Sequence, residues 1–232
     1  MLKRKLLFLL IMMILTVVIM AGSITAFLTS QKNNEKEVIV GDVDVDITVY
    51  FEKENEFGEP IKYTQNLDFI ADAGNGNTFT KFGVTKIDIS NVNEIKFIKN
   101  FRVEINVKSN VDTYFRIAPY EQLTLAYTVG DTVREVAVTQ KKFMEFNYDP
   151  SNNFLNNRMY DGFYYYKNKV KRISESQPFV INFIGEWLES VNFRLYDPKY
   201  TLQIGFYIEA VQAHLGPQIL WGLDDAPWGG EW

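Results

Sequence analysis

The sequence predicts an all-β protein: an antiparallel β-sandwich of the jelly-roll type, preceded by an N-terminal hydrophobic helix. About eight short segments alternate apolar and polar residues, with Gly, Pro and Asn between them, which is typical of a sandwich. No stretch of helical period exceeds about ten residues, so a parallel αβ repeat is not expected. Hydrophobic residues make up 47% and aromatic residues 15% of the 232 residues, which is enough for the core of one large β domain.

The first 26 residues are typical of an export signal. Three basic residues at the start precede an apolar run from Leu6 to Gly22 in which Thr16 is the one polar residue. A basic start, an apolar run and a small-residue exit are the features of a secretory signal peptide. We expect cleavage after Ala26, with Ser23 as the alternative position.

An uncleaved membrane anchor is the alternative interpretation of the same segment. The apolar character continues to Leu28, which is long enough for a helix to cross the hydrocarbon core. In both cases Lys3, Arg4 and Lys5 stay on the inner side of the membrane. The rest of the chain is therefore expected to be extracellular or on the cell surface, and membrane-anchored if the segment is retained.

Residues 27–37 form a polar linker, and residues 38–232 are expected to form a single β-sandwich domain. The first strand of that domain follows Gly41, which marks either a bulge or the start of the strand. Its inward residues are predicted by period-two alternation to be Val43, Val45, Ile47, Val49 and Phe51. A loop-rich insertion follows around residues 52–97, and we interpret residues 52–83 as one long loop.

The middle of the chain is predicted to contain two hairpins. Phe101 to Val107 alternates again, Ser109-Asn110 is interpreted as a turn, and residues 111–117 as the returning strand, ended by Pro119. A second hairpin is expected around Gly130-Asp131, with residues 123–129 and 133–138 as its strands. Residues 147–161 are loop-like. The last expected strands are residues 163–166, 179–184 and 200–213.

Composition and charge exclude several classes of function. The formal net charge is −5, and removal of the basic N-terminal segment would make it about −8, so the chain is not expected to bind nucleic acid. There is no cysteine, which excludes disulfides, thiolate metal sites and thiol nucleophiles. His214 is the single histidine, so neither a Ser-His-Asp triad nor a zinc hydrolase motif is supported. We expect no enzyme, no metal and no cofactor.

Three segments resemble the TasA/camelysin (CalY) family of SipW-dependent exported Gram-positive biofilm fibre proteins. The first runs from AGSITAF to VGDVDV, where Gly41 to Val45 is similar to the family's G-x-L-D-L strand. The second is FIKNFRVEINVKSNVDTYFRI, similar to a strand-turn-strand of the family. The third is YTLQIGFYIEAVQA, in which Glu209, Ala210 and Gln212 match a family strand. The acidic residue that the family carries after its aromatic residue is absent after Phe27.

The resemblance implies a secreted jelly-roll subunit that assembles head to tail into extracellular fibres of the biofilm matrix. Its implied partners are further copies of itself, a signal peptidase of SipW type, and other matrix proteins or polysaccharide. Assembly would proceed by strand donation, in which the N-terminal arm of one subunit completes a sheet of the next. The residues expected at this interface are Phe27, Leu28, Val38, Ile39 and Val40. The alternative is that residues 27–37 form a disordered stalk and residues 38–51 an ordinary intramolecular strand.

The aspartates before and within the first strand, and the single histidine, are the candidate metal ligands of the sequence. Asp42, Asp44 and Asp46 are expected to share a strand face, with Asp88 near them. The valines between the three aspartates exclude an EF-hand loop. A solvated acidic face is the expected interpretation. His214 is expected in a turn or cap, and a camelysin-like metallopeptidase is supported by family analogy only.

Aromatic clusters provide an alternative function. Tyr164 and Tyr166 belong to one cluster, and Trp221 and Trp228 to another. Aromatic rings on a β-sandwich can stack on sugar rings, which would make the protein a carbohydrate-binding or adhesin module. Packing in the core or at an interface explains the same rings without a ligand.

Overall fold

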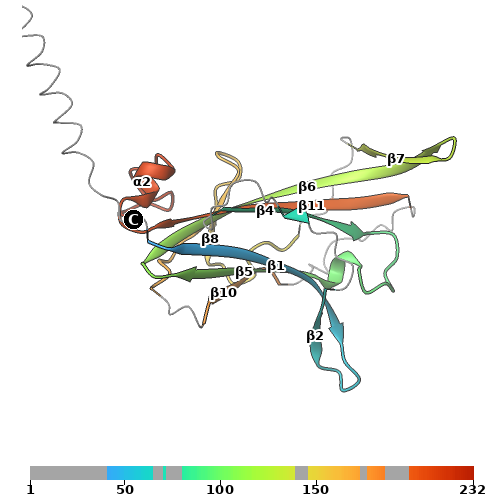
Figure 1. The fold of residues 1–232 in the computed structure, drawn as a ribbon, viewed down its shortest axis with the longest axis horizontal. Helices are drawn as coiled ribbons and strands as arrows, with labels where there is room; N and C mark the ends of the chain where they lie inside the picture. Colours follow the sequence, from blue (N-terminus) through green and yellow to red (C-terminus); the bar gives the residue numbers. More distant parts are fainter. Residues whose placement is uncertain (1–40, 65–69, 72–79, 139–145, 173–176, 186–198) are drawn as a thin grey trace, which may run out of the picture. The chain divides into compact units, whose positions relative to one another are not determined.

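The computed structural model describes residues 41–64, 70–71, 80–138, 146–172, 177–185 and 199–232. Residues 41–232 form one compact unit. Two antiparallel sheets pack against each other in this unit, so the predicted all-β sandwich is confirmed (Figure 1). The expected N-terminal helix, the linker, both cleavage positions and the five expected interface residues lie outside the described residues. No helix in the described ranges is long and apolar enough to span a membrane.

The smaller sheet has four strands in the order β10-β5-β1-β2. Their bounds are β10 Phe179–Ile184, β5 Phe101–Ser109, β1 Val43–Glu54 and β2 Pro60–Tyr63. β1 pairs with β5 over the register Val43↔Ser109 to Phe51↔Phe101. The pairing of β10 with β5 contains a bulge between Asn182 and Ile184.

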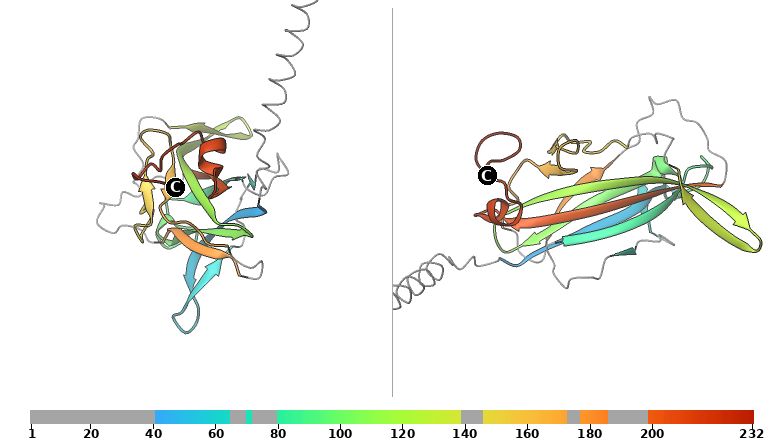
Figure 2. Two further views of the ribbon diagram at one scale, coloured as in Figure 1. Left: turned by 90° about the vertical axis from the view of Figure 1, so that its left-hand side faces the viewer. Right: turned by 90° about the horizontal axis from the view of Figure 1, so that it is seen from above.

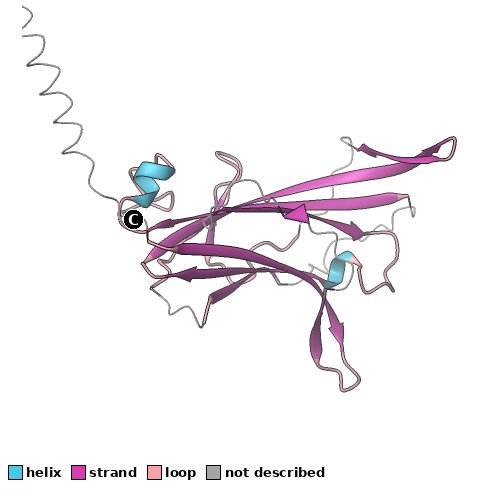
Figure 3. Ribbon diagram, in the orientation of Figure 1, coloured by secondary structure: helices cyan, strands magenta, loops and turns pink. Residues whose placement is uncertain are grey.

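The larger sheet has the order β3-β4-β11-β6-β9-β8, and β7 pairs with β6 beside this path. The strands are β3 Ile70–Ala71, β4 Thr80–Asp88, β11 Tyr200–Gln212, β6 Thr113–Val129, β9 Tyr164–Tyr166, β8 Phe154–Asn156 and β7 Thr132–Ala137. The helical segments that the structure describes are η1, Ile98–Asn100, and α2, Gly216–Leu220 (Figure 3).

The core lies between the two sheets, where the alternating strands place their apolar side chains. All five predicted inward residues of β1 are buried, which confirms the alternation. The same alternation buries Val103, Ile105 and Val107 of β5, with Leu202, Ile204, Phe206 and Ile208 of β11 opposite. Full burial of each such side chain stabilises the fold by about 1.5–3 kcal/mol.

β2, at Pro60–Tyr63, and the start of β4 correct the prediction of a long loop over residues 52–83. β4 is the longer of these two strands. Its inward residues are Gly83, Thr85 and Ile87, which lie opposite Phe206, Ile204 and Leu202 of β11. Two of these three inward positions lack an apolar side chain, so the apolar alternation that identified the other strands is missing here. Pairing with β11 forms the strand, and sequence periodicity alone does not reveal it.

The connection from β5 to β6 also differs from the prediction. The two strands were expected to form a hairpin, but β6 belongs to the other sheet, so residues 110–112 cross between the layers. Local hydrogen bonds hold this crossing. Thr113 Oγ1 donates to Ser109 Oγ at 2.7 Å, and the Asn110 N–H donates to the Asp42 carbonyl at 3.1 Å.

Pro119 does not end a strand, contrary to the prediction, because β6 runs through it to Val129. On one side Pro119 lies opposite Phe206 of β11. On the other side β6 pairs with β9 only at Arg116 and Ile117, and with β7 only from Thr124 onward. Pro119 lies in the gap between these partners, where no described strand needs its missing N–H.

The predicted hairpin around Gly130-Asp131 is confirmed, and Gly130 adopts the positive φ of 61° that its turn requires. The predicted strands at residues 179–184 and 200–213 are also confirmed, as β10 and β11. Within the segment expected to be a loop at residues 147–161, the structure adds the short strand β8.

Candidate functional site

The chain enters the sandwich at Gly41, where a side chain would not fit. A Cβ atom at this position would lie 2.2 Å from Val111 Cγ2. The Gly41 N–H donates to Gln212 Oε1 at 3.4 Å, which ties the start of the unit to the end of β11.

β1 follows this entry, and among the described strands only β2, near its end, pairs with it on the side away from β5. β5 covers its other side from Val43 to Phe51, whereas β2 pairs with it only from Phe51 to Glu54. In the described part of the chain, no second strand pairs with β1 between Asp44 and Tyr50. Such an edge presents backbone N–H and C=O groups with which another strand can pair, although the Ile47 N–H in this stretch donates to Asp46 Oδ1 at 3.0 Å.

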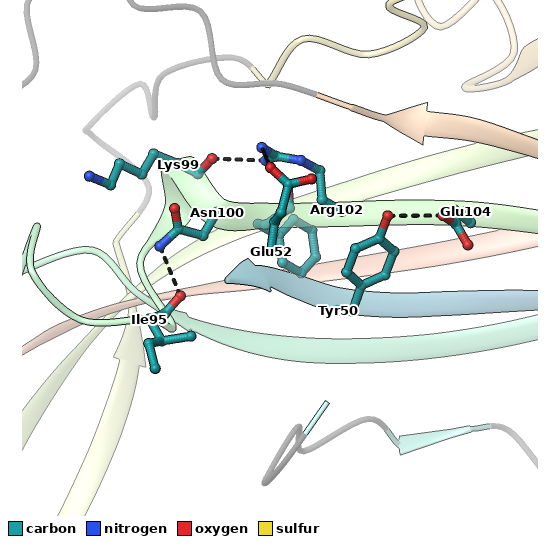
Figure 4. Close-up of polar contacts among 8 residues, drawn as sticks. Tyr50, Glu52, Ile95, Lys99, Asn100, Arg102 and Glu104 are labelled. Carbon is teal, nitrogen blue, oxygen red and sulfur yellow. Dashed lines mark hydrogen bonds and ion pairs between the residues drawn. The ribbon is translucent and has the colours of Figure 1, made fainter. Parts of the chain in front are cut away.

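The outward face of the smaller sheet carries a polar network next to this edge (Figure 4). The Tyr50 hydroxyl donates to Glu104 Oε1 at 2.9 Å, and Lys62 forms an ion pair with the same carboxylate. Burial raises the pKa of Tyr50 above its ordinary value, and the Glu104 hydrogen bond and charge raise it further. The Tyr50 phenol therefore stays protonated and donates to Glu104 at physiological pH. In the same network, Arg102 Nη2 lies 3.1 Å from Glu52 Oε1.

The acidic residues of β1 form a solvated face in this structure. Asp42 and Asp46 are exposed and Asp44 is half-buried. Asp88 does not join them, because β4 belongs to the other sheet and the Asp88 carboxylate accepts hydrogen bonds from the N–H and hydroxyl of Ser90, both at 2.7 Å. The described residues contain no group of three or more potential metal-ligating side chains.

Tyr164 and Tyr166 lie in the core, so they do not form an exposed stacking surface for sugars. Both are buried. Tyr166 stacks on Phe115 with ring centroids 4.8 Å apart, and Tyr164 meets the Phe183 ring edge-on at 5.3 Å. The packing interpretation therefore explains these two rings.

Trp221 and Trp228 pack against other aromatic rings of the same chain. Trp232 meets Trp228 at 5.1 Å and Trp221 at 5.7 Å, both edge-on, and its indole N–H donates to the Leu223 carbonyl. Tyr114 of β6 lies 5.2 Å from the Trp232 ring. These contacts dock the C-terminal tail on the outward face of the larger sheet.

An arginine cluster that sequence reasoning missed lies beside this tail. Arg116 Nη2 is 2.6 Å from Glu209 Oε2, its cross-strand partner, and both side chains are largely buried. The guanidinium carbon lies 3.9 Å from the centroid of the Phe163 ring and 4.7 Å from that of Trp221. The pairing register brings these residues together, and nothing in the order of the sequence indicates it.

Two tyrosines complete the arginine cluster. The Tyr207 hydroxyl donates to Glu209 Oε1 at 2.5 Å, and the Tyr165 hydroxyl donates to Asp161 Oδ2 at 2.6 Å. Burial, followed by these carboxylate hydrogen bonds, raises the pKa of each tyrosine to about 12. The charged groups of the cluster have partners within the cluster, and the position of Arg116 over Trp221 joins the C-terminal tail to the sheet.

A cleft of about 1040 Å³ opens beside β8. Glu121 of β6 lies at its wall, accepts a hydrogen bond from the Tyr148 hydroxyl, and has Arg158 Nη1 3.6 Å away. Burial, followed by the Glu121 charge, raises the pKa of Tyr148. Each of these polar groups has a partner within the chain, so the network joins the 146–158 segment to β6.

His214 is exposed and lies in the turn after β11. Its carbonyl accepts a hydrogen bond from Gln212 Nε2 at 3.1 Å. This position is that of the turn histidine expected from the sequence.

Comparison with known proteins yields no relative: no family model, no curated protein and no solved structure matches the chain.

Proposed function

We propose that this protein is an exported structural subunit of extracellular fibres of a biofilm matrix, and that its copies join by β-strand donation. The open side of β1 from Asp44 to Tyr50 is the observation that supports this proposal most directly. The resemblance of three segments to TasA/camelysin proteins favours the same function. Export would use a signal peptidase of SipW type, which would cleave after Ala26 or, alternatively, after Ser23.

The donor in this proposal is the segment that precedes Gly41 in another copy. Phe27, Leu28 and the run Val38 to Val40 supply apolar side chains on either side of a polar spacer. Backbone hydrogen bonds to the open edge would provide affinity, and alternate side chains would provide specificity. Because the donor and acceptor surfaces differ, the contact is head to tail, and a head-to-tail contact that does not close produces a filament.

The acidic residues beside the edge fit this role. Asp44 and Asp46 lie along the open part of β1 and carry negative charge toward solvent. Charged residues on an edge strand hinder unspecific pairing between sheets. The edge would then accept a strand that arrives at a high local concentration, as a tethered arm does.

Electron microscopy of two proteins tests the proposal. Protein beginning at Phe27 should form filaments in negative stain, and protein beginning at Gly41, which keeps the compact unit, should remain monomeric. Replacement of Val38, Ile39 and Val40 by Ser should abolish filaments, whereas the matched change of Asn33 and Asn34 to Ser in the spacer should not. Filaments of the same kind from the protein beginning at Gly41 would contradict strand donation.

A further inference from the structure

We propose that the β6–β7 hairpin of one copy docks on the α2 end of a second copy of this chain. The inference rests on the proposed function, which it deepens by naming a second contact between subunits. Four observations carry it: the protrusion of the hairpin, its apolar face, the matching surface at the other end of the unit, and complementary charges.

The hairpin extends beyond the rest of the larger sheet (Figures 1 and 2). β11 begins at Tyr200, opposite Leu125, so from Tyr127 onward β7 is the one described strand that pairs with β6. All six residues of β7 are exposed. A two-stranded hairpin is at best marginally stable on its own, so packing against another surface would stabilise it.

One face of the hairpin is apolar. Tyr127 and Arg134 are direct cross-strand partners, and Val129 and Val136 lie on the same face by alternation. Tyr127 is 44%, Val129 53% and Val136 48% exposed. Because side chains alternate along β6, Tyr127 and Val129 point to the same side of the sheet as the buried Leu123. This face of the hairpin therefore continues the inward face of the sheet beyond the core. Clustered exposed apolar side chains mark interaction surfaces.

The opposite end of the unit carries a second apolar surface. Ile219 and Leu220 of α2 are 56% and 60% exposed. α2 follows the end of β11 at Gln212, whereas the hairpin lies beside its start. The 13 residues of β11 span about 40 Å, so the two surfaces cannot meet within one copy.

The charges of the two surfaces are complementary. Arg134 is exposed on the apolar face of the hairpin, and no ion pair among the described residues includes it. Asp224 and Asp225 are exposed a few residues after α2. A contact between the hairpin and this end would pair apolar with apolar and positive with negative.

Such a contact joins different surfaces of two copies, so it is head to tail and can be repeated from copy to copy, as the contact made by the arm can. Gly41 lies at the α2 end, because its N–H bonds to Gln212. Docking would therefore bring the point where the N-terminal segment of the second copy joins Gly41 to the hairpin end of the first. The contact made by the arm and the contact made by the hairpin would therefore both join the same two ends of neighbouring copies in one fibre.

Cysteine cross-linking tests the contact directly, because the chain has no cysteine of its own. Protein from Phe27 carrying Val129→Cys is mixed with differently tagged protein carrying Leu220→Cys and is mildly oxidised. We expect a disulfide-linked heterodimer at about ten times the yield of either protein mixed with Tyr160→Cys, since a disulfide needs Cα atoms within roughly 7 Å. Tyr160 is the matched control, because it is exposed and lies in neither surface. Heterodimer at the control yield would overturn the inference.

Charge reversal adds specificity to this test. Arg134→Glu in the first protein, or Asp224→Lys with Asp225→Lys in the second, should each lower the heterodimer yield about tenfold, and combining them should restore it. Reduced yield without restoration would contradict the proposed pairing.

The two proposals can fail separately. Cross-linking that persists in protein beginning at Gly41, which lacks the arm, supports the hairpin contact whether or not the longer protein forms filaments. Filaments from the longer protein with cross-linking only at the control yield would leave strand donation standing and refute the hairpin contact.

Discussion

At the residue scale, the effect of a buried polar side chain on the stability of the sandwich depends on whether its polar atoms have hydrogen-bond or charge partners. Most buried polar atoms in the described residues have a partner, but Thr85 Oγ1 has none. Arg116 and Glu209 represent the opposite case, because they satisfy each other on the outward face of the larger sheet. The expected effects of substitution therefore have opposite signs at these two sites.

Thr85→Val should stabilise the protein. Thr85 is fully buried on the inward face of β4, and its hydroxyl loses hydration without gaining a hydrogen bond. A nearly isosteric valine removes that cost, so we expect the free energy of unfolding to rise by about 1 kcal/mol. Urea denaturation measures the change. Thr48→Val is the control, because Thr48 Oγ1 accepts a hydrogen bond from Asn106 and its loss should not stabilise. Equal stabilisation by both variants would contradict the argument.

Arg116→Ala should destabilise the protein by about 3 kcal/mol, because it leaves the Glu209 carboxylate largely buried without its charged partner. It also removes the cation that lies over Phe163 and Trp221. Lys86→Ala is the matched control, since the Lys86–Glu135 pair is exposed and should contribute less than about 1 kcal/mol. Urea denaturation compares the two. Similar losses in both variants would show that burial of the pair does not matter.

The tyrosines of the same cluster predict the alkaline limit of stability. The pKa of Tyr165 and of Tyr207 is raised to about 12 in the folded chain, against an ordinary value of 10. As the pH rises, tyrosine in the unfolded chain loses its proton before Tyr165 and Tyr207 in the folded chain do. The contribution of these two tyrosines to the free energy of unfolding is therefore complete below pH 10 and is lost as the pH rises to about 12. The urea midpoint measured from pH 8 to pH 12 should fall above pH 10. In the double variant Tyr165→Phe, Tyr207→Phe, the urea midpoint should fall less above pH 10. The same fall in the variant as in the original protein would contradict the role of these two tyrosines.

At the scale of elements, close approaches and sheet pairing determine where each strand begins and what it contacts. The alternation in β1, β5, β10 and β11 was visible in the sequence, because each puts a continuous row of apolar residues into the core. β4 was not visible, because Gly83 and Thr85 occupy two of its inward positions. The crossing between β5 and β6 was also hidden, since a short turn sequence does not state whether the next strand returns to the same sheet.

Gly41→Ala should destabilise the start of β1. The new methyl group would overlap the Val111 side chain, so either that side chain or the chain entry must shift. Overpacking of this kind costs about 1–3 kcal/mol. The double variant Gly41→Ala, Val111→Ala makes room and should cost less than the sum of the two single changes, as a urea double-mutant cycle can measure. Additive costs would contradict the contact.

At the scale of the whole molecule, residues 41–232 combine a well-packed centre with exposed extensions. β11 lies between β4 and β6, and β5 lies between β1 and β10, so their backbones are paired on both sides. β7 and the open part of β1 have a described partner on one side only. Local opening is easiest where pairing is one-sided and side chains are exposed.

Hydrogen exchange should reproduce this division in the monomer. We expect the amides of β7 to exchange fast and those of β11 and β5 to be the slowest, because the latter open only with the whole fold. On assembly, both β7 and the open side of β1 should gain protection if the two proposed contacts form, while α2 should gain it together with β7. Protection of β7 without α2 would count against the hairpin contact, and slow exchange of β7 in the monomer would contradict the division itself.

The sequence by itself determined which segments alternate, which faces are apolar and which chemistry is excluded, because periodicity and composition are local properties. It predicted the all-β sandwich and the Gly130 turn for that reason. Only the tertiary structure decided which sheet each strand joins, that Arg116 meets Glu209 and Tyr50 meets Glu104, and that Tyr164 and Tyr166 lie inside. Tyr50 and Glu104 are 54 positions apart in the sequence, and Arg116 and Glu209 are 93 positions apart. Backbone hydrogen bonding is the same for every strand, so the choice among partners depends on packing of the complete sandwich.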